Sequence, residues 1–206
     1  MHALPVELVL QGREVLVVGP FAEAAGKVER LLDAGAKVTV ISESAPTPDL
    51  LALTDRVELL ERAAVDADLA DKALVYVGPW ATPDDEARAR RWHADALQRG
   101  ALFCAIDRPE TSTFTNVGVV RASGLTLTIS SGGKSPGLVR RLREDLEQVL
   151  GDARLGRLVE ALAARRAKLP RGERAGPMAE AIRGFALRAS LVFPPWFERD
   201  DGEASR

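Results

Sequence analysis

Short apolar runs alternate with longer amphipathic stretches over the first half of the chain. The runs are rich in branched aliphatic residues, as in buried parallel strands, whereas the stretches between them repeat their apolar positions at helical spacing. We expect strands at 14–19, 37–41, 57–60, 73–78 and 102–106, and helices at 21–34 and 83–98. This alternation predicts an α/β fold with an open, doubly wound parallel sheet.

The pattern changes after residue 107. Two apolar runs at 114–120 and 125–129 follow each other with no helical stretch between them, and helical periodicity then returns at 135–150, 153–168 and 178–190. We therefore expect three parts: a Rossmann-like domain over 1–110, a small β-hairpin and helix unit over 111–150, and a helical C-terminal domain over 151–206.

Composition narrows the class of protein. The 206 residues carry a net charge of −2, which argues against general nucleic-acid affinity, and no apolar run reaches the roughly 18 residues of a membrane span. A single cysteine excludes an internal disulfide and a cysteine-based zinc site, and the first residues lack the features of a secretory signal. We expect a cytoplasmic protein that binds neither nucleic acid nor membrane.

The loop at 19–24, GPFAEA, follows the first strand, where a dinucleotide-binding domain carries G-x-G-x-x-G/A. Gly19 and Ala24 match the first and third positions. Phe21 replaces the glycine that lets a pyrophosphate approach the backbone, and Pro20 lacks an amide donor. Two interpretations remain open: a dinucleotide site, or a plain strand-to-helix turn in a domain that has lost its cofactor.

Two acidic residues follow other expected strands. Glu43 lies just past the second strand, where a carboxylate can accept hydrogen bonds from ribose hydroxyls, or can simply be solvated. Asp107 ends the fifth strand and is suited to proton transfer, or alternatively to forming a turn before proline. Cys104 lies within an apolar strand and is expected in the core rather than as a nucleophile.

The sequence SSGGKSP at 130–136 forms the most specific local motif of the chain. Its two glycines allow successive amides to face one concavity, Lys134 adds a charge, and Ser135 is a good helix cap. The motif predicts a site for carboxylates or phosphates, or else a well-capped helix without a ligand. Ten Lys/Arg against six Asp/Glu at 140–174 indicate an acidic partner or a solvated helical face.

Four segments resemble the precorrin-2 dehydrogenase/sirohydrochlorin ferrochelatase family, the N-terminal module of siroheme synthase. They read LPVELVLQGREVLVVG, KVERLLDAGAKVTVI, FCAIDRP and LTLTISSGGKSPGLVRRLREDLE, and the resemblance covers nearly all of residues 3–190. It implies NAD-dependent oxidation of precorrin-2 to sirohydrochlorin in siroheme biosynthesis. In bifunctional members ferrous iron is then inserted as a second substrate. It also implies a homodimer, with the 111–150 unit contributing to the interface.

The resemblance also assigns roles to individual residues. The family's key aspartate, a general base, falls on Asp107, and a serine that is phosphorylated in some members falls on Ser131. The residues expected to bind NAD are Gly19, Ala22, Glu23, Glu43 and Ser44. The residues expected to bind the carboxylate-rich tetrapyrrole are Ser131, Gly132, Gly133, Lys134 and Ser135.

One departure from the family keeps other functions open. The family usually has three consecutive glycines where this chain has Gly19-Pro20-Phe21. One alternative is therefore a tetrapyrrole-binding or chelating paralogue that has lost NAD binding. Another is a non-catalytic dimeric binding protein on the same fold.

Overall fold

The computed structural model describes residues 3–19, 23–78 and 82–197. The chain divides into two compact units, which are described separately below. The first comprises residues 1–117 with 132–134, and the second comprises residues 118–131 with 135–206. Within the described ranges, no helix combines the length and the apolar character needed to cross a bilayer.

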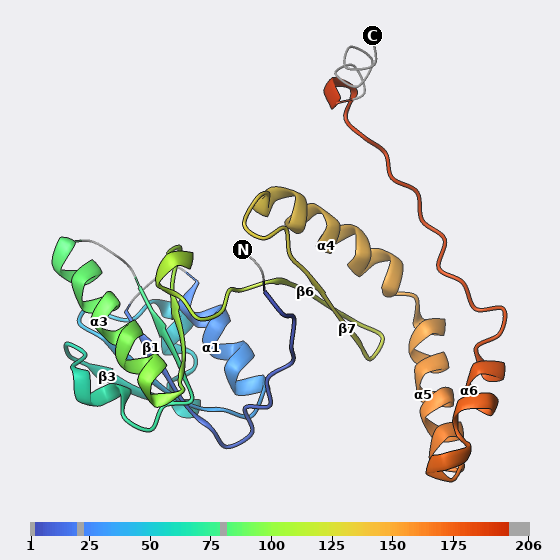
Figure 1. Ribbon diagram of the computed structural model, residues 1–206, viewed down its shortest axis with the longest axis horizontal. Helices are drawn as coiled ribbons and strands as arrows, with labels where there is room; N and C mark the ends of the chain where they lie inside the picture. Colours follow the sequence, from blue (N-terminus) through green and yellow to red (C-terminus); the bar gives the residue numbers. More distant parts are fainter. Residues whose placement is uncertain (1–2, 20–22, 79–81, 198–206) are drawn as a thin grey trace. The chain divides into compact units, whose positions relative to one another are not determined.

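A five-stranded parallel sheet forms the centre of the first unit (Figure 1). Its strand order is β3-β2-β1-β4-β5, which places the first strand in the middle and reverses the winding direction there. The strands are β1 Glu14–Val18, β2 Lys37–Ser42, β3 Glu58–Glu61, β4 Leu74–Val77 and β5 Leu102–Ala105. The predicted doubly wound α/β fold is thus confirmed.

Both faces of this sheet are covered by helices, which explains why the strands are continuous apolar runs. Alternate residues of β1 point to opposite sides, so Val17 packs in the cluster under α1 (Ala24–Asp33) and Leu16 in the cluster under α3 (Pro83–Arg99). The short helix α2, Pro48–Leu51, was not expected from the sequence because four residues are too few to show a helical period.

The second unit begins with an antiparallel hairpin of β6 (Gly118–Ala122) and β7 (Leu125–Ile129). Helices α4 (Pro136–Leu150), α5 (Ala153–Ala167) and α6 (Ala175–Ala181) follow. The hairpin turn is tied to the end of α4, because the hydroxyl of Ser123 donates to the Leu150 carbonyl over 2.7 Å. Short 3₁₀ turns lie at Thr54–Arg56, Asp66–Leu69, Pro109–Thr111 and Arg171–Glu173.

Two expected elements are longer than the observed ones. The strand expected at 114–120 begins only at Gly118, because Phe114 packs edge-on against the Tyr76 ring and Asn116 accepts a hydrogen bond from the Tyr76 hydroxyl. The helix expected at 178–190 is observed as α6 and ends at Ala181. Gly184, with φ of +85°, then takes a left-handed conformation that a helix cannot continue through.

The packing on the α3 face allows a test of the fold. Phe103 on β5 is fully buried there, so Phe103→Ala is expected to lower the free energy of unfolding by about 3–5 kcal/mol. Leu97 on α3 is 56% exposed, and Leu97→Ala is the matched control, with an expected change of less than about 0.5 kcal/mol. Urea unfolding followed by tryptophan fluorescence measures both; equal changes would contradict this description of the core.

Candidate functional site

The carboxyl ends of the parallel strands are held level with one another. Three backbone hydrogen bonds continue the strand pairing just past the strand ends, so the loops that follow leave from one edge of the sheet. They run from Gly19 N–H to the Ile41 carbonyl (2.8 Å), from Gly78 N–H to the Val18 carbonyl (3.0 Å) and from Ile106 N–H to the Val77 carbonyl (2.9 Å). Ligands of doubly wound folds bind at this edge.

The loop after β1 keeps part of the geometry of a dinucleotide site. Gly19 has φ of +97°, the left-handed turn that the first glycine of the fingerprint provides, and Ala24 is only 2% exposed where α1 packs closely on the sheet. No side chain of the described residues caps the N-terminus of α1. The three other long helices, α3, α4 and α5, are capped by Thr82, Ser135 and Asp152. Pro20, Phe21 and Ala22 lie outside the described residues.

Glu23 precedes α1, and Lys27 lies one turn further along it. The Glu23 side chain is 77% exposed, with a carboxylate oxygen 3.7 Å from the amine of Lys27. The Lys27 side chain is only 12% exposed, and its amine lies 5.4 Å from the centroid of the Tyr76 ring. The amine thus offsets part of the negative charge that Glu23 places at this helix end. Lys27 was not expected from the sequence as a residue of this site.

The loop after β2 presents Glu43 to solvent. Ser42 is buried, and its hydroxyl donates to the Ser44 carbonyl (2.7 Å) and accepts from the Ser44 amide (3.2 Å). This local turn uses the backbone of Ser44 and leaves the side chain of Glu43 exposed at the carboxyl edge of the sheet. The structure therefore places Glu43 beside the loop of Gly19, since β2 and β1 are adjacent.

Asp107 lies at the same edge, in the loop after β5. Its φ is +60°, a region that aspartate tolerates better than most residues but that still costs backbone energy. The side chain is exposed, and its carboxylate makes no hydrogen bond or ion pair within the described part of the chain. Asp107 thus lies in a turn shortly before Pro109, and its role in proton transfer stays a prediction.

Ser112, which follows the backbone turn that carries Asp107, holds this turn together by hydrogen bonds. The Ser112 hydroxyl accepts from the Ala105 amide (3.0 Å) and donates to the Arg108 carbonyl (2.8 Å), so it bridges the two sides of the turn. The neighbouring Thr113 hydroxyl accepts from the Phe103 amide over 2.8 Å. Sequence reasoning missed both residues; their only signal is the hydroxyl-rich TST segment that follows the turn.

Cys104 lies in the core, as expected. Its side chain is buried on β5, and burial raises the pKa of the thiol, so the reactive thiolate is disfavoured. Burial likewise raises the pKa of Tyr76, whose hydroxyl donates to Asn116 over 2.9 Å. No group of three or more His, Cys, Asp or Glu side chains within the described ranges is arranged to hold a metal ion.

In the SSGGKSP loop before α4, the hydroxyls of Ser131 and Ser135 accept hydrogen bonds from backbone amides of the loop and of α4. The Ser131 hydroxyl accepts from the Ser135 amide over 2.9 Å, and the Ser135 hydroxyl accepts from the Leu138 amide over 3.4 Å. Gly132 and Gly133 have φ of +61° and +84°, and Lys134 is exposed. The Ser135 amide is therefore already hydrogen-bonded within the loop. The binding of an anion by this loop stays a prediction.

Ser112 offers a test of how the Asp107 turn is held. Ser112→Ala removes both bridging hydrogen bonds and leaves the Ala105 amide without its partner, at an expected cost of about 1–3 kcal/mol of unfolding free energy. Amide exchange at Ala105 and Arg108 should also accelerate. Thr115→Ala, at an exposed position three residues away, is the control. Unchanged exchange in Ser112→Ala would show that the turn is held by other contacts.

Two family models match consecutive parts of the chain. The model described as "Putative NAD(P)-binding" matches residues 6–118, and the model described as "Sirohaem biosynthesis protein central" matches residues 123–148. The first match covers more than half of the chain, and it spans the loops of Gly19, Glu43 and Asp107.

Curated relatives agree with these models. The chain is 38% identical over 160 residues to siroheme synthase 2 of Aeromonas hydrophila subsp. hydrophila. The aligned region covers 78% of this chain and 33% of the relative. It is 36% identical over 152 residues to siroheme synthase of Escherichia coli, and this aligned region covers 73% of this chain and 32% of the relative. The chain thus spans about a third of the length of these relatives.

A solved structure shares the fold. The structure titled "SirC, precorrin-2 dehydrogenase" superposes with a TM-score of 0.69, covering 88% of this chain and 90% of that chain at 19% identity. The resemblance seen in the sequence is thus confirmed by family models, relatives and fold. The chain belongs to the putative NAD(P)-binding family, and it is a relative of the siroheme synthases.

Proposed function

We propose that this chain is an NAD-dependent precorrin-2 dehydrogenase, which oxidises precorrin-2 to sirohydrochlorin in siroheme biosynthesis. The observation that carries the proposal is the exposed carboxylate of Asp107, held in a left-handed turn at the same sheet edge as Gly19 and Glu43. A carboxylate at the edge where such folds hold a dinucleotide supports a role for Asp107 as proton acceptor. The similarity to siroheme synthases supports the choice of substrate.

The described residues fit a bound dinucleotide. The turn at Gly19 and the amides at the start of α1, which no described side chain caps, suit a pyrophosphate, and Glu43 is exposed where it can accept from a ribose hydroxyl. NAD, when bound, supplies the acceptor for the hydride. This fit favours the dehydrogenase over a paralogue that has lost its cofactor.

Asp107 would take the proton. Oxidation of precorrin-2 removes a hydride and a proton, and an exposed carboxylate without an ion-pair partner among the described residues is able to receive the latter. The bridge by Ser112 holds the backbone turn from which this carboxylate projects. The same group can accept the pyrrole protons that ferrous iron displaces, which is the basis for proposing sirohydrochlorin ferrochelatase as a second activity of the chain.

The proposal is tested by anaerobic absorbance of precorrin-2 mixed with the purified chain, with and without NAD. Sirohydrochlorin is expected to form only with NAD, and Asp107→Asn should lower kcat by about 10²-fold or more while NAD affinity stays unchanged. Glu110→Gln, a nearby exposed carboxylate on the following turn, is the control and should retain full activity.

The outcomes separate the alternatives. No oxidation by a folded wild-type chain that still binds the tetrapyrrole would favour the cofactor-free paralogue. Oxidation at the same rate in Asp107→Asn would remove this residue from the mechanism. Adding ferrous iron after the oxidation is complete then measures chelation in the same cuvette, where absence of siroheme would contradict the second activity.

We also propose that the chain works as a homodimer in the cytoplasm, where NAD is available. The β6–β7 sheet has only two strands, and the outer edges of both lack a strand partner within the described ranges, so a second copy can extend the sheet. Light scattering of the purified chain is expected to give the mass of two copies. A monomer at micromolar concentration would contradict the dimer without affecting the assignment of the chemistry.

A further inference from the structure

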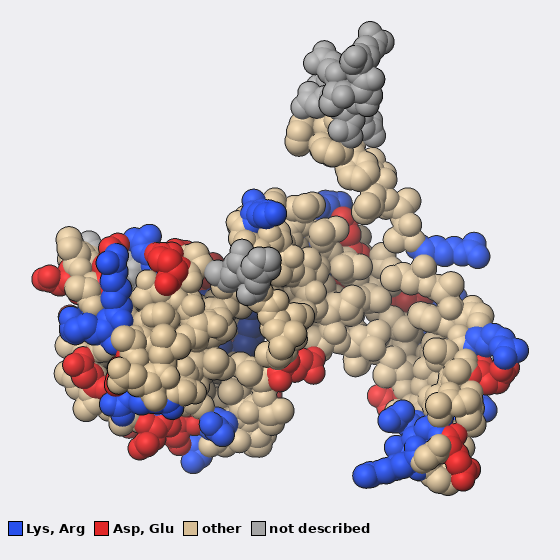
Figure 2. Space-filling model, viewed as in Figure 1, with Lys and Arg blue, Asp and Glu red and all other residues tan. Residues whose placement is uncertain are grey.

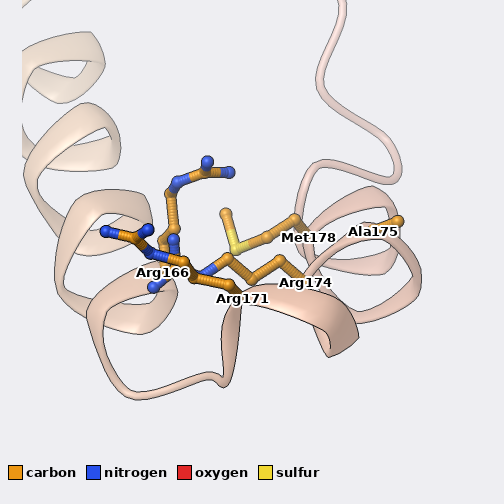
Figure 3. A pocket seen from close by; sticks show the side chains of 5 residues that line it. All are labelled: Arg166, Arg171, Arg174, Ala175 and Met178. Carbon is orange, nitrogen blue, oxygen red and sulfur yellow. The ribbon is translucent and has the colours of Figure 1, made fainter.

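Helices α5 and α6 form a helical hairpin in the second unit, and this hairpin contains a cavity. It has a volume of about 580 Å³ and lies between the end of α5, the following 3₁₀ turn and the start of α6 (Figure 3). Arg166, Arg171, Arg174, Ala175 and Met178 line it. All five belong to one short stretch of a single unit, so the cavity is complete within that unit. Its volume falls within the range of small-molecule sites, about 300–1,000 Å³.

The local fold holds one arginine of this cavity in place. The Nε–H of Arg174 donates to the Leu169 carbonyl over 3.0 Å, which closes the turn between α5 and α6. This contact fixes the direction of the guanidinium and leaves its terminal amino groups for a ligand. The Met178 side chain extends from α6 toward the arginines and gives the cavity an apolar wall (Figure 3).

The guanidinium groups of Arg166 and Arg171 make no hydrogen bond or ion pair with any residue that the structure describes. This is unlike α4, where Arg140, Arg141 and Arg143 each pair with the carboxylate four residues on. Between residues 165 and 174 the chain has five Lys/Arg and one Asp/Glu, and none of the described residues that line the cavity is acidic. Figure 2 shows basic side chains projecting from the tip of this hairpin, with acidic side chains beside them. The positive charge of the cavity is therefore not neutralised from within.

We propose that this arginine cavity binds the carboxylate arms of the tetrapyrrole, and the proposal rests on the function proposed above. A guanidinium pairs with a carboxylate through two parallel hydrogen bonds, and three of them around one cavity match a ligand with several carboxylates. The thioether of Met178 suits the edge of a flat conjugated ring.

Binding is tested on the full chain, without NAD, using uroporphyrin I as a stable porphyrin whose rim carries carboxylate arms. Arg166→Gln combined with Arg171→Gln is expected to raise the Kd at least tenfold in a fluorescence titration. Arg174 is left unchanged because its substitution would also remove the contact with the Leu169 carbonyl. The matched control, Arg140→Gln with Arg141→Gln on α4, removes the same charge outside the cavity and should change the Kd less than threefold.

Several results would overturn the proposal. They are an unchanged Kd in the cavity variant, an equal loss in the control variant, and no binding of the porphyrin by the wild-type chain. Circular dichroism establishes that both variants keep their helical content before the titration. The proposed function fails separately, because a chain that binds uroporphyrin I through the cavity but does not oxidise precorrin-2 supports the site and contradicts the dehydrogenase.

Discussion

The candidate site depends on the alignment of the parallel strands at their carboxyl ends. Because β1, β2, β4 and β5 are hydrogen-bonded in register past their last residues, the loops of Gly19, Glu43 and Asp107 start from one level. None of these residues needs to contact another to belong to the same site. The buried apolar runs therefore do more than stabilise the unit, since their register decides where polar chemistry is exposed.

Local pairing of charges separates structural residues from candidate functional ones. Arginines along α4 are each matched by a carboxylate one turn away, which is the usual arrangement on a solvated helix. Asp107, Arg166 and Arg171 have no such partner among the described residues, although Asp107 is followed by Arg108 and Arg171 lies two positions from Glu173. A charge left without a partner in a fixed turn or cavity remains available to a ligand.

The apolar periodicity was enough to predict every strand of the parallel sheet and the three longest helices, because burial imposes that periodicity. It failed at 114–117 and 182–190. In the first segment Phe114 and Asn116 contact Tyr76, which is distant in sequence. The sequence allowed a turn at Asp107 as one of two interpretations, but not its bridge by Ser112, since hydroxyl-to-backbone bonds depend on which segments the fold brings together.

The Ser112 bridge also limits how this part of the chain can vary. Surface loops ordinarily accept insertions, because added residues extend into solvent at little entropic cost. Here the serine must reach both the Ala105 amide and the Arg108 carbonyl, so the interval of five positions from Asp107 to Ser112 has a fixed length. A single added residue would separate the aspartate from its support even with every side chain retained, and the spacing is thus as much a part of the site as the residues.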